Sequence, residues 1–159
     1  MGALAGLSFR ALPLLGLAAL FVILARAPGT PAPVGQVLVS TGYLAALGSL
    51  WLNRHHGWLR PVLLGAALNA AAILANGGRM PVSAAALSRI AHPLLPGVHS
   101  GADPWHVLAG PGIPLSYLGD ILAVQIGGVG VILSPGDVLM AVGIAGVVQA
   151  AICRTASSG

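Results

Sequence analysis

The sequence lacks most of the charge that a protein needs in order to stay dissolved in water. Its 159 residues include no lysine and no glutamate, and charged residues make up only 6% of the chain. Soluble domains carry roughly 25% charged residues. Hydrophobic residues account for 57% of the chain, and the mean hydropathy is +0.93. We therefore expect the solvent around this protein to be lipid.

Cysteine and clustered basic residues are also scarce, which excludes further classes of protein. Cys153 is the only cysteine, so neither an intrachain disulfide nor a zinc site built from cysteines can form. The arginines are scattered and form no basic run, so no nucleic-acid partner is indicated. The glycine-rich residues 127–131 lack the strand–helix context of a nucleotide-binding loop, and no cofactor is predicted.

Long apolar runs dominate what the sequence does contain. A helix that crosses a bilayer needs roughly 20 apolar residues. The region between the third and fourth runs is rich in glycine and proline, too broken to cross hydrocarbon as a helix. The sequence predicts an all-α integral membrane protein, a single domain over residues 1–159 with an outer loop at 76–136. Its four transmembrane helices are expected at about residues 7–25, 34–52, 58–75 and 137–152.

The arginines beside these runs indicate the orientation in the membrane. Cytoplasmic loops carry an excess of Lys and Arg. With the N-terminus inside, four arginines (10, 54, 60 and 154) lie inside and three (26, 79 and 89) lie outside. We therefore expect both termini in the cytoplasm. A rival interpretation treats the first run as a cleaved secretory signal, because "ARA" precedes Pro28, although proline directly after the cut is unfavourable.

The third run stops abruptly at "NGGRMPVSAAAL", residues 76–87. Glycine just past a helix end supplies the left-handed conformation that turns the chain away from the helix, and Ser83 can cap a short helix over "SAAALSRIAH". One interpretation is a simple exit from the membrane, and the other is a functional loop. The loop residues that we single out are Asn76, Gly77, Gly78, Arg79, Met80 and Pro81.

Several motifs in the second two thirds of the chain carry a resemblance. They are "LN" at 68–69, "ANGGRMPVSAAAL" at 75–87, "HVLA" at 106–109, "LGDI" at 118–121 and "SPGDVLMAVGI" at 134–144. In this order, residues 51–154 resemble the bacterial membrane family filed as domain of unknown function 5317. The resemblance implies a multi-spanning inner-membrane protein and gives no activity. It places Asn69 and His106 within the matching blocks.

Asp120 and Asp137 are the candidate catalytic residues. Each follows a glycine where the outer loop meets the membrane. Two carboxylates brought close together share a proton, an arrangement that activates water for peptide hydrolysis. "LGDILAV" and "SPGDVLMAVG" are similar to the two aspartate motifs of lipoprotein signal peptidases, although Ser134 stands where that family has Asn. The structural alternative is that each aspartate caps a helix.

Histidines and amides are weaker candidates. His92, His99 and His106 recur every seven residues, but intervening prolines prevent one helix from aligning them, so no metal site is predicted. Asn69 and Gln149 interrupt apolar helices, where an amide seeks another polar group.

These observations leave two functions open, and they leave enzymatic activity undecided. The first is an integral membrane protein that acts as a scaffold or handles small molecules or lipids through its outer loop. The second is a membrane-embedded aspartic hydrolase. Membrane lipids are the expected partners, and a second membrane protein or another copy of the chain is left open. We expect residues 76–82, Asp120 and Asp137 to form one site. Arg79 in contact with either aspartate would favour a structural role. Two carboxylates that face each other across a cavity, with Arg79 pointing away, would favour hydrolysis.

Overall fold

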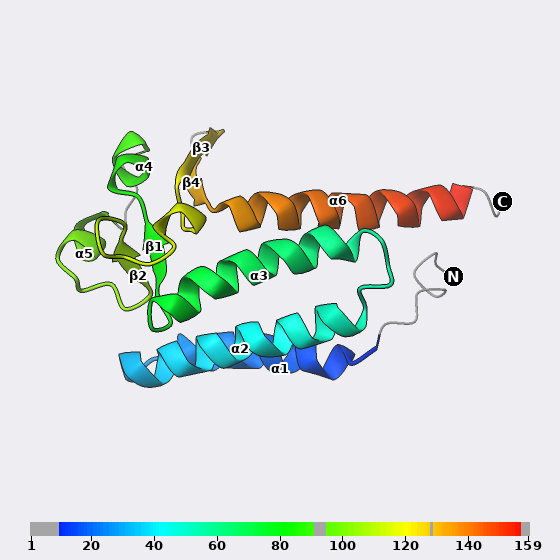
Figure 1. Ribbon diagram of the computed structural model, residues 1–159, viewed down its shortest axis with the longest axis horizontal. Helices are drawn as coiled ribbons and strands as arrows, with labels where there is room; N and C mark the ends of the chain where they lie inside the picture. Colours follow the sequence, from blue (N-terminus) through cyan, green and yellow to red (C-terminus); the bar gives the residue numbers. More distant parts are fainter. Residues whose placement is uncertain (1–9, 91–94, 128, 157–159) are drawn as a thin grey trace.

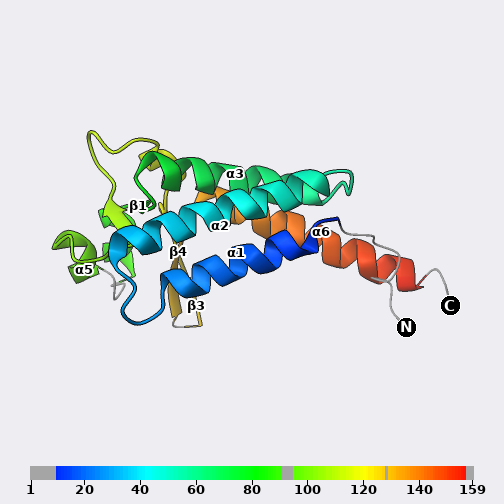
Figure 2. The same ribbon diagram turned by 90° about the horizontal axis from the view of Figure 1, so that it is seen from below.

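Four long helices run side by side along the longest axis of the molecule, and a compact segment lies at one end of them (Figure 1). The computed structural model describes residues 10–90, 95–127 and 129–156. The long helices are α1 (Leu12–Ala25), α2 (Ala32–Leu52), α3 (Leu59–Ala75) and α6 (Pro135–Ala156). Successive long helices are antiparallel, with α1 packed on α2, α2 on α3 and α3 on α6. Figure 2 shows α1, α2 and α3 side by side, with α6 behind them.

The four helices expected from the apolar runs are all present. The first predicted run began at residue 7, and its residues 7–9 lie outside the described part of the chain. α6 begins two residues earlier than predicted and continues to Ala156. Among the described helices, α2 is long and apolar enough to cross a membrane, whereas α1, α3 and residues 135–150 are apolar but shorter. A helix of this kind is consistent with membrane association, although core helices of soluble proteins meet the same criterion.

Small residues let the helices approach closely. A Cβ added to Gly143 of α6 would lie 2.5 Å from Cγ2 of Val62 on α3. On the other side of the bundle, a Cβ on Gly42 of α2 would lie 3.1 Å from the carbonyl oxygen of Ala18 on α1. Such contacts are typical of helices that associate through van der Waals packing. Large apolar side chains are correspondingly left on the outside, including Ile23, Val37, Leu64 and Ile144.

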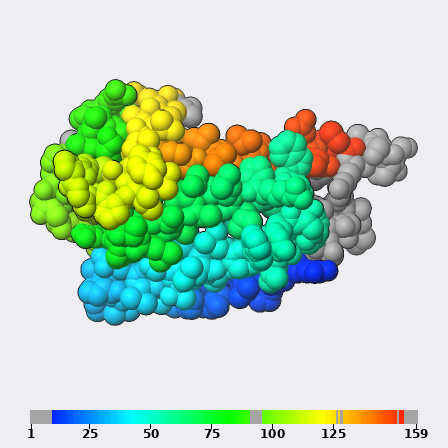
Figure 3. Space-filling model, in the orientation of Figure 1, coloured from blue at the N-terminus to red at the C-terminus, as the bar shows by residue number. Residues whose placement is uncertain are grey.

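Residues 76–134 are called the connector, and the described part of this segment covers one end of the helices (Figure 3). The connector contains β1 (Met80–Val82), α4 (Ala84–Arg89), α5 (Leu95–His99), β2 (His106–Leu108), a 3-10 turn η1 (Ser116–Leu118), β3 (Leu122–Ile126) and β4 (Val129–Leu133). β1 pairs in parallel with β2, with Met80 opposite His106. β3 and β4 form an antiparallel hairpin with Leu122 opposite Leu133.

The strands correct the prediction of an all-α protein, although the chain is mostly helical as expected. The glycine-rich residues 127–131 and their neighbours were not predicted to form strands, yet residues 122–126 and 129–133 form this hairpin. Valine and isoleucine favour strands because their branched side chains pack well on a pleated surface. Gly127 has φ of 56° and supplies the left-handed residue that a tight hairpin turn requires.

The exit from α3 agrees with its prediction in detail. Gly77 and Gly78 have φ of 63° and 87°, and the Gly78 N–H donates to the Ile73 carbonyl at 2.9 Å. This is the Schellman arrangement that ends a helix. Ser83 caps α4, since its Oγ accepts a hydrogen bond from the Ala86 N–H at 3.3 Å. Both predicted helix signals are therefore confirmed.

Candidate functional site

A cavity of about 380 Å³ lies where the connector meets the four long helices. Each long helix contributes to its wall, and the connector supplies the remainder. The lining residues are Val22 and Arg26 from the end of α1, Val39 and Tyr43 from α2, Asn69 and Ile73 from α3, Asp137 from α6, and Gly78, Met80, Trp105, His106, Asp120 and Ile132 from the connector.

Asp137 is positioned by the way that α6 begins. Ser134 is the N-cap residue, Pro135 occupies the first helical position, and Asp137 occupies the third. The Ser134 N–H donates to Asp137 Oδ2 at 2.8 Å, while the Asp137 N–H donates to Ser134 Oγ at 2.9 Å. This reciprocal pair is a capping box, and proline is well suited to the first position because its missing N–H has no helical partner. Asp137 thus belongs to the helix cap, as one interpretation of the sequence expected, but Ser134 is the cap residue itself.

Asn69 connects this cap to α3. Its Nδ2 donates to Asp137 Oδ1 at 2.8 Å, and its Oδ1 accepts a hydrogen bond from Ser134 Oγ at 2.8 Å. Both Asn69 and Ser134 are buried, with 2% and 0% of their surfaces exposed. Gly136 permits this contact, because a Cβ at that position would collide with the Asn69 amide oxygen. The amide on α3 therefore finds its polar partners on α6, as expected for an amide among apolar helices.

Asp120 is held in place by the backbone of β1. Its N–H donates to the Pro81 carbonyl at 2.8 Å, and its carbonyl accepts a hydrogen bond from the Ser83 N–H at 2.9 Å. Gly119 allows this approach, since a Cβ there would collide with the Pro81 carbonyl. The Asp120 side chain makes no hydrogen bond to any described residue and lines the cavity. Burial, and then the nearby negative charge of Asp137, raise the pKa of Asp120 to about 7.

Arg79 lies outside this arrangement. Its side chain is exposed, it does not line the cavity, and within the described residues no ion pair joins it to either aspartate. The cation at the cavity is instead Arg26, whose guanidinium carbon lies 5.3 Å from the centroid of the Trp105 ring. Asp120 and Asp137 thus share one cavity from which Arg79 is absent.

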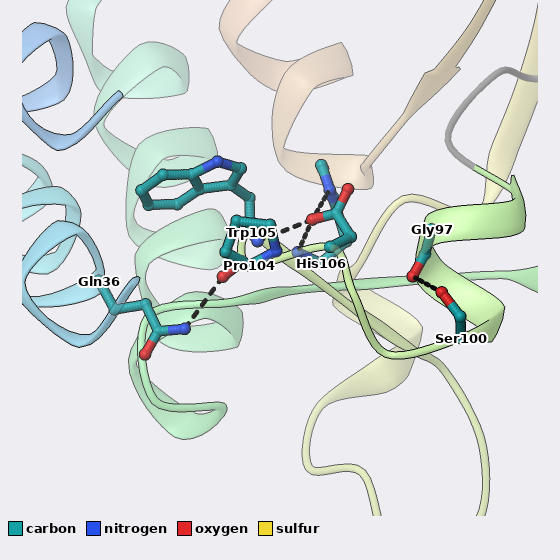
Figure 4. A network of polar contacts seen from close by, with 7 residues as sticks. Gln36, Gly97, Ser100, Pro104, Trp105 and His106 are labelled. Atoms are coloured by element: carbon teal, nitrogen blue, oxygen red, sulfur yellow. Dashed lines mark hydrogen bonds and ion pairs between the residues drawn. The ribbon is translucent and has the colours of Figure 1, made fainter. Parts of the chain in front are cut away.

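Trp105 and His106 contribute to the connector wall of the cavity. Figure 4 shows the polar contacts around them. The Asp103 carboxylate accepts hydrogen bonds from the Trp105 N–H at 2.7 Å and the His106 N–H at 2.9 Å, and it contacts His106 Nδ1 at 3.1 Å. Partial burial would raise the pKa of Asp103, but these hydrogen bonds and the charge of His106 lower it. Gln36 of α2 donates to the Pro104 carbonyl at 3.0 Å, which attaches this wall to the helices.

The sequence pattern of one family matches residues 7–149 and is described as a family of unknown function (DUF5317). The chain belongs to this family. No curated protein matches the chain, and no solved structure matches it either. These comparisons therefore supply no activity for this DUF5317 protein, and they add no support to the similarity with lipoprotein signal peptidases.

Not all of the predicted residues of this DUF5317 protein reach the cavity. Asn76 is buried at the end of α3, where its Nδ2 donates to the carbonyls of Ala72 at 2.7 Å and Pro114 at 2.9 Å, so its role is to fasten the connector. Pro81 is buried within β1 and Gly77 forms the turn, and neither lines the cavity. The predicted residues that do line it are Asn69, Gly78, Met80, His106, Asp120 and Asp137.

The seven-residue histidine pattern does not bring its members together in the described part of the chain. His99 is exposed at the end of α5, His106 lines the cavity, and His92 lies outside the described residues. The described residues contain no group of three potential metal ligands. The pattern therefore carries no argument for a metal.

Sequence reasoning missed the contributions of the first two long helices and of Trp105 in the connector. Arg26, Tyr43 and Trp105 line the cavity, yet no local motif marks them. Ser134 was also missed, although the spacing of Ser134 and Asp137 is that of a capping box and provides a usable signal.

Proposed function

We propose that this DUF5317 protein is a multi-pass protein of the bacterial inner membrane, with α1, α2, α3 and α6 crossing the bilayer. α2 has 21 residues, which correspond to about 32 Å of helix and match a hydrocarbon core of about 30 Å. The apolar stretches of α1, α3 and α6 are shorter, and a bilayer accommodates short stretches by local thinning. The low charge and the apolar outer faces of the helices support the same proposal. The connector then lies on the outer face, and both termini lie in the cytoplasm.

We propose further that the cavity is the site of an aspartic hydrolase. The observation that carries this proposal is that Asp120 and Asp137 line one cavity while Arg79 lies outside it. An Asp–Arg pair would have favoured a structural role for the aspartate. Two carboxyl groups whose surroundings differ can instead take opposite roles as acid and base. Asp120, with its raised pKa, is suited to hold a proton near neutral pH.

In the proposed reaction Asp137 is the general base and Asp120 is the general acid. Asp137 accepts two N–H donors, which occupy two of the roughly four acceptor positions of a carboxylate. A remaining position can take a proton from water as the water oxygen bonds to the carbonyl carbon of an amide. Asp120 gives its proton to the carbonyl oxygen. The tetrahedral intermediate then loses its amine as the C–N bond breaks and the nitrogen gains a proton from Asp137. Asp120 regains its proton from a hydroxyl group that stays on the carbon and becomes the carbonyl of the new carboxyl terminus.

The surroundings of the two aspartates indicate the class of substrate. Val22, Val39 and Ile73 bring apolar surface from three helices to the cavity, and the connector adds Met80 and Ile132. In the proposed membrane arrangement this wall lies at the outer surface of the bilayer. We infer that the substrate is a peptide inserted in the membrane or anchored to lipid.

A second candidate function is that of a scaffold or small-molecule handler without catalysis. It is favoured by the hydrogen bonds of Asp137 to Ser134 and Asn69, since these give the aspartate a structural role in joining α3 to α6. Under this alternative the cavity would bind a ligand through Asp120 and Arg26 and leave it unchanged.

Peptide cleavage in liposomes separates the two candidates. We would reconstitute the full-length protein with membrane-inserted peptides and identify new peptide termini by mass spectrometry. Asp120→Asn removes the acid and is expected to lower the cleavage rate by about 10²- to 10⁴-fold. Arg79→Gln is the matched control, because it changes a connector residue outside the cavity, and it should cleave as the unmodified protein does. Cleavage that survives in Asp120→Asn, in a protein that remains folded, would exclude the hydrolase proposal.

A further inference from the structure

Two adjoining hollows lie at the end of the helices opposite the connector. The first has a volume of about 610 Å³ and is lined by Arg10, Leu52, Arg54, His55, Arg60 and Leu63. The second has a volume of about 550 Å³ and lies between α2 and α3. Arg60 and Leu63 line both, so the two hollows form one continuous surface.

The first hollow gathers positive charge that no described carboxylate neutralises. Arg10, Arg54 and Arg60 are all exposed, and none forms an ion pair with a described residue. The chain has no glutamate, and its three aspartates belong to the connector and to the start of α6, at the other end of the molecule. This segregation leaves the hollow complementary to an anion.

The backbone around the first hollow is fixed by a buried amide. Asn53 is 2% exposed, and its side chain exchanges hydrogen bonds with the Arg10 backbone, at 2.7 Å to the N–H and 2.6 Å to the carbonyl. Arg60 Nε donates to the Arg54 carbonyl at 3.3 Å. Arg54 lies over the Trp51 ring, 4.2 Å from its centroid, and donates to the Trp51 carbonyl at 2.8 Å. The three arginines thus come from segments that are tied together, which reduces the entropy lost when they bind a common anion.

The second hollow is apolar. Besides the two shared residues, its walls include Leu47 and Trp51 from α2 and Leu64 and Ala67 from α3. Trp51 and Leu64 are 57% and 54% exposed, so the hollow is open along the outer face of the helices. A cationic hollow joined to an open apolar groove is complementary to a ligand with an anionic head and a hydrocarbon tail.

We propose that this surface is a binding site for one anionic glycerophospholipid, with its phosphate among Arg10, Arg54 and Arg60 and an acyl chain in the groove between α2 and α3. Basic pockets between helices at a membrane surface bind anionic headgroups in this way, and the stem of Arg60 covers apolar surface while its charged end meets the phosphate. The site is separate from the aspartate cavity and does not depend on hydrolysis.

Lipid binding to the full-length protein in neutral detergent tests this site. Native mass spectrometry would compare phosphatidylglycerol with phosphatidylcholine, and inorganic phosphate would serve as the headgroup without a tail. We expect a clear preference for phosphatidylglycerol. Arg60→Gln should weaken phosphatidylglycerol binding about fivefold, the effect of one arginine near an anionic surface. Arg89→Gln, at the connector end, is the matched control and should bind as the unmodified protein does.

A second pair of variants tests the groove. Ala67→Leu fills part of the groove and should weaken phosphatidylglycerol binding, whereas Ala71→Leu, one turn further along α3 and outside the groove, should leave it unchanged. Circular dichroism and size-exclusion chromatography would establish that each variant is folded. Three results would each overturn the proposal: equal binding of the two lipids, equal losses in Arg60→Gln and Arg89→Gln, or full displacement by inorganic phosphate with no effect of Ala67→Leu.

Discussion

Replacing Asp120 by asparagine removes a titrating group from the cavity while keeping the shape of the side chain. The Asp120 backbone holds its place beside β1, and its carboxyl group makes no hydrogen bond to a described residue. The substitution therefore changes the protonation of the cavity more than its packing. We expect it to alter how the free energy of unfolding depends on pH.

The size of the effect follows from the pKa of the carboxyl group in the folded and unfolded chains. The pKa of Asp120 rises from 3.8 to about 7 on folding. A carboxyl group with a raised pKa binds its proton more tightly in the folded protein than in the unfolded chain. Its contribution to the free energy of unfolding is therefore fully present below pH 3.8 and is lost as the pH rises to about 7. One pH unit corresponds to about 1.4 kcal/mol, which gives about 4 kcal/mol over this interval. Asp120 is only partly buried, so solvent screens its charge, and we expect about 2 kcal/mol.

Chemical unfolding in mild detergent, followed by far-ultraviolet circular dichroism between pH 4 and pH 8, measures this quantity. Tyr43, His106, Arg26 and Asp137 also line the cavity, but they are present in both proteins, so the difference between the proteins isolates Asp120. Asp120→Asn should match the unmodified protein near pH 4 and be about 2 kcal/mol more stable at pH 8. Equal stability of the two proteins across the whole pH range would refute the raised pKa and the acid role built on it.

Three further changes test the architecture of the site. Ser134→Ala removes the N-cap of α6 and a hydrogen-bond partner of Asn69. It should lower the free energy of unfolding by about 1–2 kcal/mol in the same denaturation assay. An unchanged denaturant midpoint would contradict the role of the cap. Gly119→Ala places a Cβ against the Pro81 carbonyl and should be destabilising by about 1–3 kcal/mol, whereas Gly110→Ala, where a Cβ would meet nothing within 4 Å, should cost less. The opposite order would contradict the close approach of Asp120 to β1. Asp137→Asn removes the negative charge beside Asp120, so the pKa of Asp120 should fall below about 7 but stay above 3.8, because burial remains. Infrared titration of the protonated carboxyl band measures this pKa, and an unchanged pKa would contradict the contribution of Asp137.

The long helices could be predicted from the sequence because each is encoded locally. An apolar run of sufficient length identifies a helix wherever its partners lie, and Gly77, Gly78 and Ser83 mark helix boundaries through residues close to them in the chain. The connector strands could not be found in this way. β1 and β2 have three residues each, and they pair across a separation of 26 residues, from Met80 to His106. Strand pairing of this kind depends on long-range contacts that a local pattern does not contain.

Only part of the candidate site could be predicted from the sequence, for the same reason. Asp120 and Asp137 stand out because a carboxylate is rare in so apolar a chain. The Arg26 side chain, by contrast, reaches the cavity only because α1 packs on α2 and Trp105 lies beneath its guanidinium group. Arg79 attracted attention through its unusual neighbours in the sequence, yet the backbone turn at Gly77 and Gly78 leaves its side chain exposed. Proximity in sequence to a conspicuous motif therefore did not indicate proximity to the cavity.

The most direct test of the proposed hydrolysis is the incorporation of oxygen from water into the product. Full-length protein in liposomes would be incubated with a membrane-inserted peptide in ¹⁸O-labelled water, and the new carboxyl terminus would be weighed by mass spectrometry. The proposed reaction adds one water oxygen at the cleaved carbonyl, so the unmodified protein should yield singly labelled termini, and folded Asp120→Asn should yield almost none. Unlabelled peptide recovered intact with the unmodified protein, or equal labelling by both proteins, would contradict a hydrolytic role for Asp120 and Asp137.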